Sequence, residues 1–456
     1  MHNSRSALLT GKYVRQRRDF EMIFQKDIET MPRSEIESLQ LERLKHLVKY
    51  CYDNVPFYHK RFDEAGVKPE DIKTLKDIRR IPLTTKADMR DNYPFGMFAV
   101  PTKKITRIHA SSGTTGKPTV VGYTARDLDM WSDCVARVAM AAGADDSTIV
   151  QICFGYGLFT GALGLHYGLE KIGATIVPSS SGNTEKQIML MEDFGTNAIV
   201  ATPSYAQYIG ELAREKGVLD RLNLKLGILG SEGCTLEMRS AIEKTLGLFV
   251  TDNYGMSELG GPGVSGECEE RDGLHINEDH FLCEIIDPNT GEVLPEGSEG
   301  ELVVTTLTKE GMPVLRYRTR DITHINYEKC RCGRTFARMA KTRGRSDDML
   351  KIRGVNVFPS QIESVLMGFG EIAPHYQLVL TRENFADQLE IKVELDEKYS
   401  EMLDDYQRLH DLHAKITHEL KVVLGISTKL TIVDCKTLER FQGKAKRILD
   451  LRSQAK

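Results

Sequence analysis

The sequence contains no long apolar run and no excess of charge of either sign. No stretch of its 456 residues is apolar over about 18 positions, the length of a membrane-spanning helix, so we expect no spanning segment. Its 61 Lys and Arg residues are offset by 65 Asp and Glu residues, which gives a formal charge of −4. Binding of nucleic acid through bulk charge needs a clear basic excess. We therefore expect neither a nucleic-acid partner nor a membrane.

The chain also lacks the apolar core of a secretory signal near Met1. Its nine cysteines, an odd number scattered through a long chain, do not form the pattern of a disulfide framework. Hydrophobic residues make up 41% and charged residues 28%, which are ordinary values for a globular protein. Together these features predict a cytoplasmic enzyme with reduced thiols.

Hydrophobic periodicity divides the chain into sections. Residues 13–110 are predicted to be rich in α-helix because apolar residues recur there at helical spacing, with Ser34 as a candidate cap and Pro56 as a helix breaker. Residues 111–262 alternate short apolar runs with helical stretches, which is typical of a parallel sheet. Residues 280–327 alternate with a period of two between turn signals and predict antiparallel strands.

The expected architecture is an α/β fold with two domains. Residues 1–343 would form a large N-terminal domain with a parallel sheet and a β-rich section, and residues 344–456 a small α+β domain. The predicted strands are 149–154, 198–201, 226–229, 378–381, 389–395 and 429–433, and the predicted helices are 128–142, 185–194, 361–368 and 406–424.

The sharpest local signal is a run of hydroxyl residues and glycines that ends in a basic residue: Ser111-Ser112-Gly113-Thr114-Thr115-Gly116-Lys117-Pro118-Thr119. The glycines permit tight turns whose amides can face an anion, and the hydroxyls can donate to phosphate oxygens. Lys117 adds a mobile positive charge. The glycine spacing differs from that of a Walker loop. The run predicts a phosphate-binding loop, with a flexible polar turn as the alternative.

Four further motifs follow along the chain. They are Asp252-Asn253-Tyr254-Gly255-Met256-Ser257-Glu258, Tyr317-Arg318-Thr319-Arg320-Asp321, the stretch 344–359, and Gly443-Lys444-Ala445-Lys446-Arg447. Together with the phosphate loop, these motifs resemble those of the adenylate-forming superfamily of acyl-CoA synthetases, adenylation domains and luciferases. More narrowly, nearly the whole chain resembles the phenylacetate–coenzyme A ligases.

The resemblance implies roles around a nucleotide. Tyr254 would stack on adenine and Asp252 would contact its amino group. Ser257 would lie near the phosphates and Glu258 would bind Mg²⁺. Asp321 would accept hydrogen bonds from both ribose hydroxyls. The full set of residues expected to bind the nucleotide is Ser111, Ser112, Gly113, Thr114, Thr115, Gly116, Lys117, Ser231, Glu232, Asp252, Asn253, Tyr254, Gly255, Met256, Ser257, Asp321 and Arg345.

The C-terminal motifs would supply the moving part of such an enzyme. The resemblance implies that Lys444 is the catalytic lysine, that Asp347 is the hinge, and that Arg353 and Gly354 contact coenzyme A. These roles suit the chemistry, because attack of a carboxylate on the α-phosphate brings two anions together and must be assisted electrostatically.

The stretch Phe154–Gly164 is rich in glycine and aromatic residues. In the resembled family it lines the acyl pocket, with Tyr156 and Phe159 facing an aromatic ring, and Gly161 and Gly230 complete the expected set. Glycines let the backbone approach a flat ligand, and aromatic side chains pack against its ring. The alternative is that the two aromatic residues belong to the ordinary core.

Four residues could make a tetrahedral metal site. Cys330 and Cys332 are one residue apart, and Cys268 and His275 lie upstream. Three thiolates and one imidazole suit Zn²⁺, although the spacing departs from the usual pattern. Structural zinc is therefore predicted, with free cytosolic thiols as the alternative.

The motifs together predict an AMP-forming acid–thiol ligase. An aryl acid, phenylacetate in the resembled family, would react with ATP and then with coenzyme A, with Mg²⁺ as cofactor and a homodimer as the assembly. Three alternatives stay open: an enzyme that adenylylates a deazaflavin cofactor and stops there, an adenylation enzyme that loads a carrier protein, and a non-catalytic nucleotide sensor.

Overall fold

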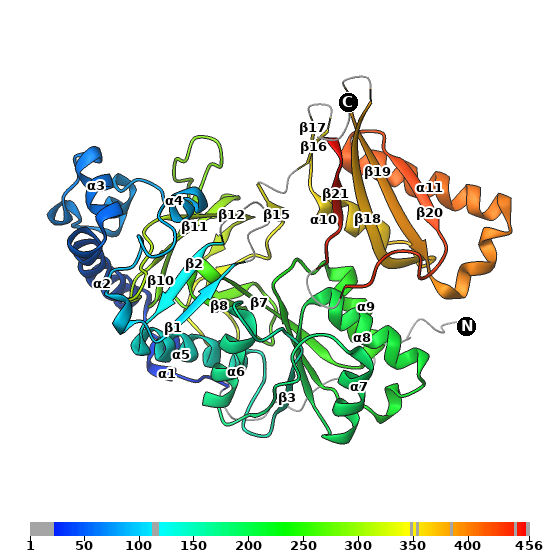
Figure 1. Cartoon of the computed structure of the whole chain (residues 1–456), viewed down its shortest axis with the longest axis horizontal. Coiled ribbons are helices and arrows are strands. Elements are labelled where there is room, and N and C mark those ends of the chain that lie inside the picture. Colours follow the sequence, from blue (N-terminus) through cyan, green and yellow to red (C-terminus); the bar gives the residue numbers. More distant parts are fainter. Residues whose placement is uncertain are drawn as a thin grey trace, which may run out of the picture.

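The computed structural model of the chain describes residues 22–111, 118–346, 350–352, 355–383, 386–441 and 445–452. They form a large body and a small body, and the small body lies beside the helices α8 (Pro203–Glu215) and α9 (Leu236–Leu246) of the large one (Figure 1). The buried core of the small body begins at Leu350 and is separate from the main core of the large body, which ends at Met339. The fold is thus of the predicted α/β class with a smaller α+β unit.

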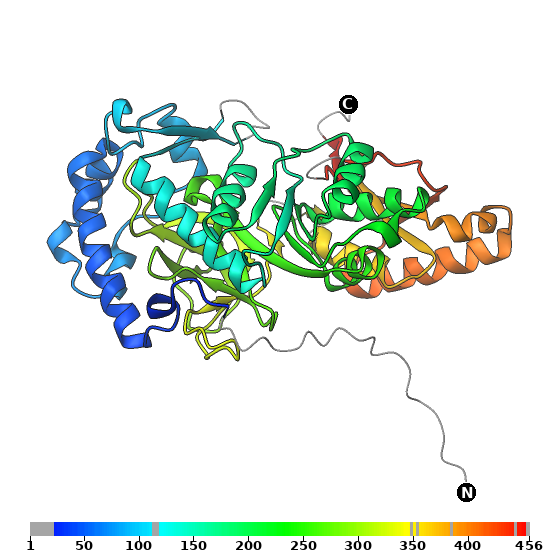
Figure 2. The same ribbon diagram turned by 90° about the horizontal axis from the view of Figure 1, so that it is seen from below.

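Helices form the N-terminal end of the large body, opposite the small body (Figure 2). The carbonyl of Pro32 accepts the first helical bonds from the amides of Glu35 and Ile36, at 2.9 and 3.0 Å, so the helix starts earlier than predicted. The prediction of Ser34 as the cap is therefore wrong, whereas the predicted break before Pro56 is confirmed. The elements are α1 (Lys26–Glu29), α2 (Arg33–Asn54), α3 (Pro56–Ala65) and α4 (Lys86–Asp91), with 3-10 turns at Pro69–Asp71, Leu75–Arg80 and Thr102–Lys104.

A sheet of nine strands, counted over the described residues, forms the centre of the large body in the order β13-β14-β9-β8-β7-β6-β5-β3-β4. Strands β3 to β7 run parallel, as predicted, and the remaining strands are antiparallel. The bounds are β3 (Ile149–Ile152), β4 (Thr175–Val177), β5 (Ala198–Ala201), β6 (Leu226–Gly230), β7 (Phe249–Met256), β8 (Gly261–Glu267), β9 (Leu274–Ile276), β13 (Ile325–Asn326) and β14 (Arg338–Met339).

Both faces of this sheet are covered. Strand β5 shows the arrangement, because Ala198 and Val200 join one hydrophobic cluster and Ile199 and Ala201 join another. Successive side chains of a strand point to opposite faces, so a strand buried on both faces is apolar throughout. Helices α5 (Ala125–Ala141) and α6 (Gly161–Lys171) contribute to the first cluster, and α7 (Thr184–Asp193), α8 and α9 to the second; a 3-10 turn at Leu219–Arg221 follows α8.

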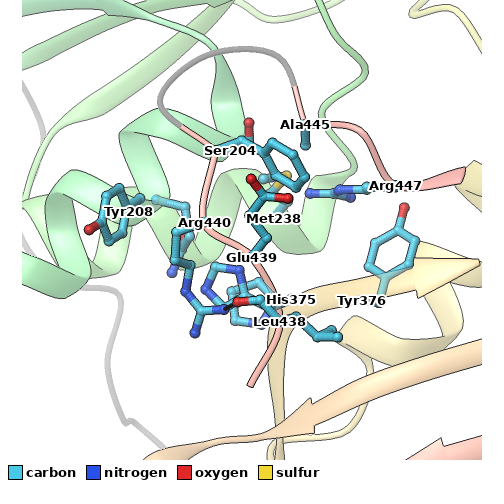
Figure 3. A pocket seen from close by; sticks show the side chains of 13 residues that line it. Ser204, Tyr208, Met238, His375, Tyr376, Leu438, Glu439, Arg440, Ala445 and Arg447 are labelled. Atoms are coloured by element: carbon cyan, nitrogen blue, oxygen red, sulfur yellow. Dashed lines mark hydrogen bonds between the residues drawn. The ribbon is translucent and has the colours of Figure 1, made fainter. Parts of the chain in front are cut away.

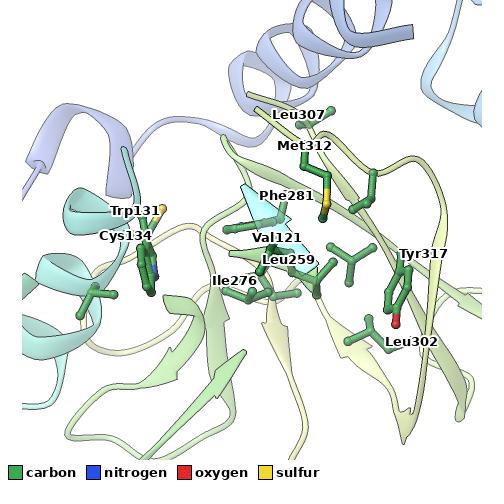
Figure 4. Close-up of a cluster of buried hydrophobic side chains, with 14 of the residues drawn as sticks. Val121, Trp131, Cys134, Leu259, Ile276, Phe281, Leu302, Leu307, Met312 and Tyr317 are labelled. Atoms are coloured by element: carbon green, nitrogen blue, oxygen red, sulfur yellow. The ribbon is translucent and has the colours of Figure 1, made fainter. Parts of the chain in front are cut away.

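The β-rich section continues the first cluster, which runs from Trp131 of α5 to Tyr317 (Figure 4). The described strands here pair in the order β10-β11-β12-β15, all antiparallel as predicted. A separate hairpin lies beside them. The bounds are β1 (Arg107–Ala110) and β2 (Val120–Tyr123) for the hairpin, and β10 (Phe281–Ile286), β11 (Gly300–Thr306), β12 (Tyr317–Thr323) and β15 (Gly344–Arg345) for the sheet.

The small body packs two helices on an antiparallel and parallel sheet of order β20-β19-β18-β21. Its elements are the hairpin β16 (Leu350–Ile352) and β17 (Val355–Val357), α10 (Pro359–Met367), β18 (Ile372–Glu383), β19 (Ala386–Leu395), the 3-10 helix Glu397–Leu403, α11 (Tyr406–Leu424), β20 (Lys429–Val433) and β21 (Ile448–Asp450). Across the parts of the chain that the structure describes, every helix is too short or too polar to span a bilayer.

Candidate active site

The hairpin β1–β2 brings together Ser111 and Thr119, the two ends of the predicted phosphate loop. Its strands pair as far as Ala110 and Val120, and the amide of Ser111 donates to the carbonyl of Thr119 at 2.9 Å. The amide of Thr119 in turn donates to the Ser111 hydroxyl at 3.2 Å. The amide of Ala110 donates to the carbonyl of Leu158 at 2.9 Å, which places the base of the loop beside the predicted acyl segment.

Strand β7 contains most of the motif Asp252–Glu258, which is called the adenylate motif below. The hydroxyl of Tyr254 donates to Oδ2 of Asp321 at 2.6 Å, so residues of two motifs 67 positions apart are in direct contact. The side chain of Asn253 donates to the carbonyl of Leu229 at 2.7 Å. A Cβ at Gly230 would lie 2.6 Å from the carbonyl oxygen of Asn253, so this close approach of β6 and β7 requires glycine.

Glu258 follows in the 3-10 turn Ser257–Leu259 and is buried, with 3% of its surface exposed. Its Oε1 lies 3.5 Å from Nζ of Lys86 and accepts no hydrogen bond from the described residues. Burial raises the pKa of Tyr317 well above its usual range, and the nearby negative charge of Glu258 contributes. A buried carboxylate oxygen without a hydrogen-bond donor fits a hard cation such as Mg²⁺.

Asp321 lies on β12 and pairs in register with Arg345 of β15, the last strand of the large body. Tyr317, at the start of β12, lies close enough to Glu258, Arg345 and Asp321 for all three charges to affect its pKa, after the larger effect of burial. The structure therefore brings the predicted magnesium, ribose and phosphate residues around one tyrosine.

Arg320 has a left-handed backbone conformation, with φ of +69°. Glycine adopts this conformation without steric cost, whereas a residue with a side chain, such as Arg320, is strained in it. The side chain of Arg320 lies 3.5 Å from Oε2 of Glu301, and its carbonyl accepts a 2.7 Å hydrogen bond from the amide of Ser346. The strained residue thus contacts the start of the segment that leads to the small body.

Asp252, on β7, is partly buried within a cluster of charged side chains. Its Oδ2 lies 3.7 Å from Nζ of Lys341, and its amide donates to Glu267 at 2.9 Å. Burial raises the pKa of Asp252 to about 6, and the positive charge of Lys341 opposes this shift. Arg239 pairs with Glu267 at 2.5 Å and adds a second positive charge.

The predicted acyl segment connects β3 to α6. The hydroxyl of Tyr156 is 3.0 Å from Nδ1 of His166, and burial raises the pKa of Tyr156. Phe159 is 52% exposed, and Gly161 is the first residue of α6. The hydroxyl of Thr160 lies 3.2 Å from that of Ser257, so the segment contacts the adenylate motif directly. Acid and nucleotide residues therefore border each other.

The loop after β6 holds Ser231 and Glu232. Ser231 has a left-handed backbone, with φ of +71°, which is uncommon for serine and typical of functional loops. The Oε1 of Glu232 accepts the amide of Ser204 at 2.7 Å and also its hydroxyl, and Oε2 accepts the amide of Ala445 at 3.1 Å. Both carboxylate oxygens of this predicted AMP contact are thus engaged by protein donors.

The four predicted metal ligands gather on one side of the sheet. Their ligand atoms all lie within 4.8 Å of one another. Sγ of Cys268 is 3.8 Å from Sγ of Cys330, and Sγ of Cys332 is 3.4 Å from Nε2 of His275. A tetrahedral Zn²⁺ with ordinary bond lengths separates its ligands by about 3.5–3.8 Å. The remaining ring nitrogen of His275 lies 3.4 Å from the carbonyl of Phe336, an orientation that leaves Nε2 free for a metal.

Several predicted residues lie outside the described residues. They are Ser112, Gly113, Thr114, Thr115, Gly116 and Lys117 of the phosphate loop, the hinge residue Asp347, the coenzyme A residues Arg353 and Gly354, and Lys444.

Sequence patterns carry no signal for the basic residues around the site. Lys86, which pairs with Glu258, lies far upstream of every motif, and Lys341 precedes the stretch that starts at Gly344. Lys309 is 2% exposed, and its Nζ lies 4.7 Å above the ring of Tyr123. Lysine is common on any surface, so only the folded structure identifies those that reach a buried carboxylate or ring.

The chain matches two family models. Residues 36–308 match the model described as AMP-binding enzyme, and residues 354–452 match the AMP-binding enzyme C-terminal domain. The structure has a TM-score of 0.89 with 2-hydroxyisobutyryl-CoA ligase in the postadenylation state in complex with 2-HIB-AMP, at 28% identity and with 95% of this chain and 93% of that chain covered. Fold and site thus define an adenylate-forming enzyme.

Two curated relatives narrow the family. The phenylacetate–coenzyme A ligase of Thermus thermophilus is 50% identical over 444 residues, which cover 94% of this chain and all of the relative. That of Escherichia coli is 50% identical over 429 residues, which cover 93% of this chain and 97% of the relative. The chain belongs to the phenylacetate–coenzyme A ligase family, as its motifs predicted.

The same 2-hydroxyisobutyryl-CoA ligase has also been solved with 2-HIB-AMP and CoA in the thioesterification state. The TM-score with that structure is 0.70, at 29% identity and with 94% of this chain and 92% of that chain covered. Since identity and coverage are almost unchanged, the difference between 0.89 and 0.70 reflects the arrangement of the two bodies. The arrangement of the two bodies in this chain is therefore more similar to that of the relative in its postadenylation state.

Proposed function

We propose that the protein joins phenylacetate or a similar aryl acid to coenzyme A with ATP, through an acyl-adenylate. The observation that carries the proposal is the meeting of three of the motifs: the Tyr254 hydroxyl donates to Asp321 at 2.6 Å, and Asp321 pairs in register with Arg345. The curated relatives, named phenylacetate–coenzyme A ligases at about half identity, support the choice of acid.

In the first step, a carboxylate oxygen of the acid attacks the α-phosphorus of ATP and the bond to pyrophosphate breaks. In the second step, the coenzyme A thiol attacks the acyl carbon and AMP leaves. Asp321 is suited to bind both ribose hydroxyls, because a carboxylate accepts two hydrogen bonds. The ring of Tyr254 would stack on adenine, and Asp252 would contact its amino group.

Glu258 is the proposed ligand of Mg²⁺. When bound to phosphate oxygens, this cation would neutralise charge that develops in the transition state. Lys86 balances the buried carboxylate, and Lys444 is proposed to contact the reacting phosphate during the first step only. The backbone of the loop from Ser111, with Lys117, would hold the terminal phosphates, and Ser257, next to Glu258, would face them.

The acid would lie against the segment Phe154–Gly164. Its exposed ring, Phe159, is available to a ligand, and Tyr156 is held in place by His166. Indoleacetate, hydroxyphenylacetate and benzoate-like acids are close in size to phenylacetate. One methylene changes binding in an apolar pocket by only about 1–3 kcal/mol, so the preferred acid has to be measured.

The test is a coupled assay of AMP release with a panel of aryl acids, with and without coenzyme A. We expect sustained AMP release only when an aryl acid and coenzyme A are both present. Adenylyl transfer to a cofactor without coenzyme A would favour the deazaflavin enzyme instead, and transfer to a carrier protein the carrier-loading enzyme. Nucleotide binding without turnover of any acid would favour a sensor and overturn the proposal.

We also propose that Cys268, His275, Cys330 and Cys332 hold one structural Zn²⁺. The metal would fix the loop between β13 and β14 onto β8 and β9. The same loop is held from the other side by the buried ion pair of Arg334 with Glu29, at 2.6 Å.

Metal analysis of the purified protein by mass spectrometry checks the zinc site. We expect about one zinc per chain, and a Cys330→Ser variant should lose most of it because structural zinc needs its complete ligand set. A Cys435→Ser variant, altered at a cysteine outside the cluster, serves as the control and should keep the metal. Less than about 0.2 zinc per chain in the unaltered protein would contradict the site.

The resemblance further implies a cytoplasmic location, a homodimeric assembly and a role in the breakdown of aromatic acids. We propose all three. Light scattering checks the assembly, since a dimer has twice the 51.3 kDa mass of one chain. A monomer at assay concentration would contradict it.

A further inference from the structure

The large body meets the small body through carboxylates. Four glutamates of α8, α9 and the loop after β6 each contact a group of the small body. The contacts are Glu211 with His375 at 2.9 Å and Arg440 at 4.0 Å, Glu215 with Lys436 at 3.3 Å, Glu232 with the Ala445 amide at 3.1 Å, and Glu237 with Ser364 at 3.4 Å. Carboxylates of the large body therefore face hydrogen-bond donors of the small body, which include the basic side chains of His375, Arg440 and Lys436.

Glu232 differs from the other three glutamates in what it holds. Its partner in the small body is a backbone amide, and that amide belongs to Ala445, which directly follows Lys444 in the sequence. Its other oxygen accepts both the amide and the hydroxyl of Ser204, at the start of α8. The carboxylate thus ties the beginning of α8 to the segment that carries the lysine.

A small pocket between the bodies is lined by both Ala445 and His375 (Figure 3), and His375 makes a second contact with a carboxylate of the large body. Nε2 of His375, on β18, lies 2.9 Å from both carboxylate oxygens of Glu211. The hydrogen bond to His375 lowers the pKa of Glu211 against the opposing effect of burial. Within the small body, Arg447 pairs with Glu363 and lies 4.4 Å above the ring of Tyr376, which anchors the chain just beyond Ala445.

The arrangement that makes these contacts is the one more similar to the relative in its postadenylation state. The lower TM-score with the thioesterification state means that the second step uses another orientation of the small body in that relative. A contact that holds the segment next to Lys444 favours one orientation, and it stabilises the first step selectively.

We propose that Glu232 is a positioning residue for adenylation: its carboxylate holds the amide of Ala445, the residue that follows Lys444 in the sequence, against the large body, while Glu211 and His375 stabilise the same orientation. The proposal rests on the two-step function given above. It goes further because it assigns Glu232 to the orientation of the small body rather than to contact with AMP.

The test is to measure the two steps separately in Glu232→Gln. Three donors converge on this carboxylate, and an amide offers only one accepting oxygen, so the variant must lose either Ser204 or Ala445. We expect acid-dependent exchange of pyrophosphate into ATP to slow by about 10- to 100-fold, as for loss of a charge-assisted hydrogen bond. The KM for ATP should change less than threefold. Thioester formation from supplied phenylacetyl-adenylate and coenzyme A should stay within twofold.

Glu185→Gln is the matched control, because Glu185 pairs with Lys216 on the exposed surface of α7. It should leave both steps unchanged. Glu211→Gln is the second variant and tests the proposal if Glu232→Gln does not fold. It weakens the contact between Glu211 and His375 and should also slow the first step selectively.

Equal slowing of both steps, no slowing of either, or a rise in the KM for ATP that accounts for the whole effect would overturn the proposal. A rise in the KM for ATP of that size would indicate instead that Glu232 binds the nucleotide. Failure of the proposed function is distinguishable, because the unaltered protein would then show no acid-dependent exchange with any aryl acid.

Discussion

The side-chain amine of Lys309 is buried. Its Nζ donates no hydrogen bond to the described residues, and the side chain lies over the ring of Tyr123. Burial lowers the pKa of Lys309 to about 8, although the carboxylates of Asp127 and Glu258 favour its charged form. The folded protein therefore binds this proton more weakly than the unfolded chain does.

This difference makes stability depend on pH with a defined sign. Between the folded pKa of about 8 and the unfolded value of 10.5, the unfolded state holds more protons, so stability rises with pH. Relative to a Lys309→Met variant, we expect the free energy of unfolding of the unaltered protein to gain roughly 2 kcal/mol between about pH 7 and about pH 9.5. Urea unfolding of both proteins at the two pH values measures it. A parallel pH dependence in the two proteins would show that Lys309 titrates normally.

Single residues were predictable where a short string carries the role. Tyr254 and Glu258 stand in one motif, and Asp321 in another, so their types could be assigned before the fold was known. The partners of those residues were not predictable, because Lys86 reaches Glu258 from 172 positions upstream and Glu211 meets His375 across 164 positions. Such pairs depend on how the whole chain closes.

Strand β7 shows how an element aims its side chains. Its pairing with β8 shifts between Tyr254 and Gly255, so that Gly255 lies opposite Pro262. A Cβ on Gly255 would come within 1.9 Å of the carbonyl oxygen of Gly261. The two backbones approach so closely that only glycine fits, and this irregularity turns Tyr254 toward Asp321.

We expect Gly255→Ala to lower the free energy of unfolding by at least about 2 kcal/mol and to abolish adenylation, since the backbone must move to admit the methyl group. Gly233→Ala is the control, because no atom lies within 4 Å of the place that its methyl group would take. It should change stability by less than about 0.5 kcal/mol. Thermal unfolding and pyrophosphate exchange measure both effects. An equal loss in both variants would mean that the approach of β7 and β8 is not the cause.

Elements were predicted best where burial makes the pattern unambiguous. The fully buried β5 has the predicted bounds, Ala198–Ala201, and so does the amphipathic α11, Tyr406–Leu424. The start of α2 was missed because its N-cap is Pro32, whose side chain has no hydrogen-bond acceptor, so the usual capping signal is absent. Short pairs such as β13 and β14 have no periodicity to detect, since a strand of two residues is defined by its partner.

The molecule as a whole consists of two bodies joined through the segment after Arg345. The amide of Ser346 is held by the carbonyl of Arg320, so the joint begins at a residue fixed to the nucleotide site. Glutamates of α8 and α9 then contact the small body. Motion between the bodies should therefore turn about the residues that follow Ser346, where Asp347 stands.

Two variants should separate the steps in opposite ways. Lys444→Ala should abolish adenylation but still form thioester from supplied acyl-adenylate and coenzyme A, because the lysine is proposed to serve the first step only. Asp347→Pro should keep adenylation and impair thioester formation, because proline fixes φ at the proposed hinge. Both half-reactions are measured for each variant. Loss of both steps to the same extent in either variant would count against the division of roles.

The proposed site for the acid is lined by one continuous stretch, Phe154–Gly164, whereas the residues proposed to bind the nucleotide come from β7, β12 and the hairpin β1–β2. Thr160 and Leu158 connect this stretch to its neighbours through a hydroxyl and a carbonyl. Substitutions within this single loop should therefore change the acid that is accepted without altering the residues proposed to bind the nucleotide. Grafting that loop between relatives is the natural route to new aromatic thioesters.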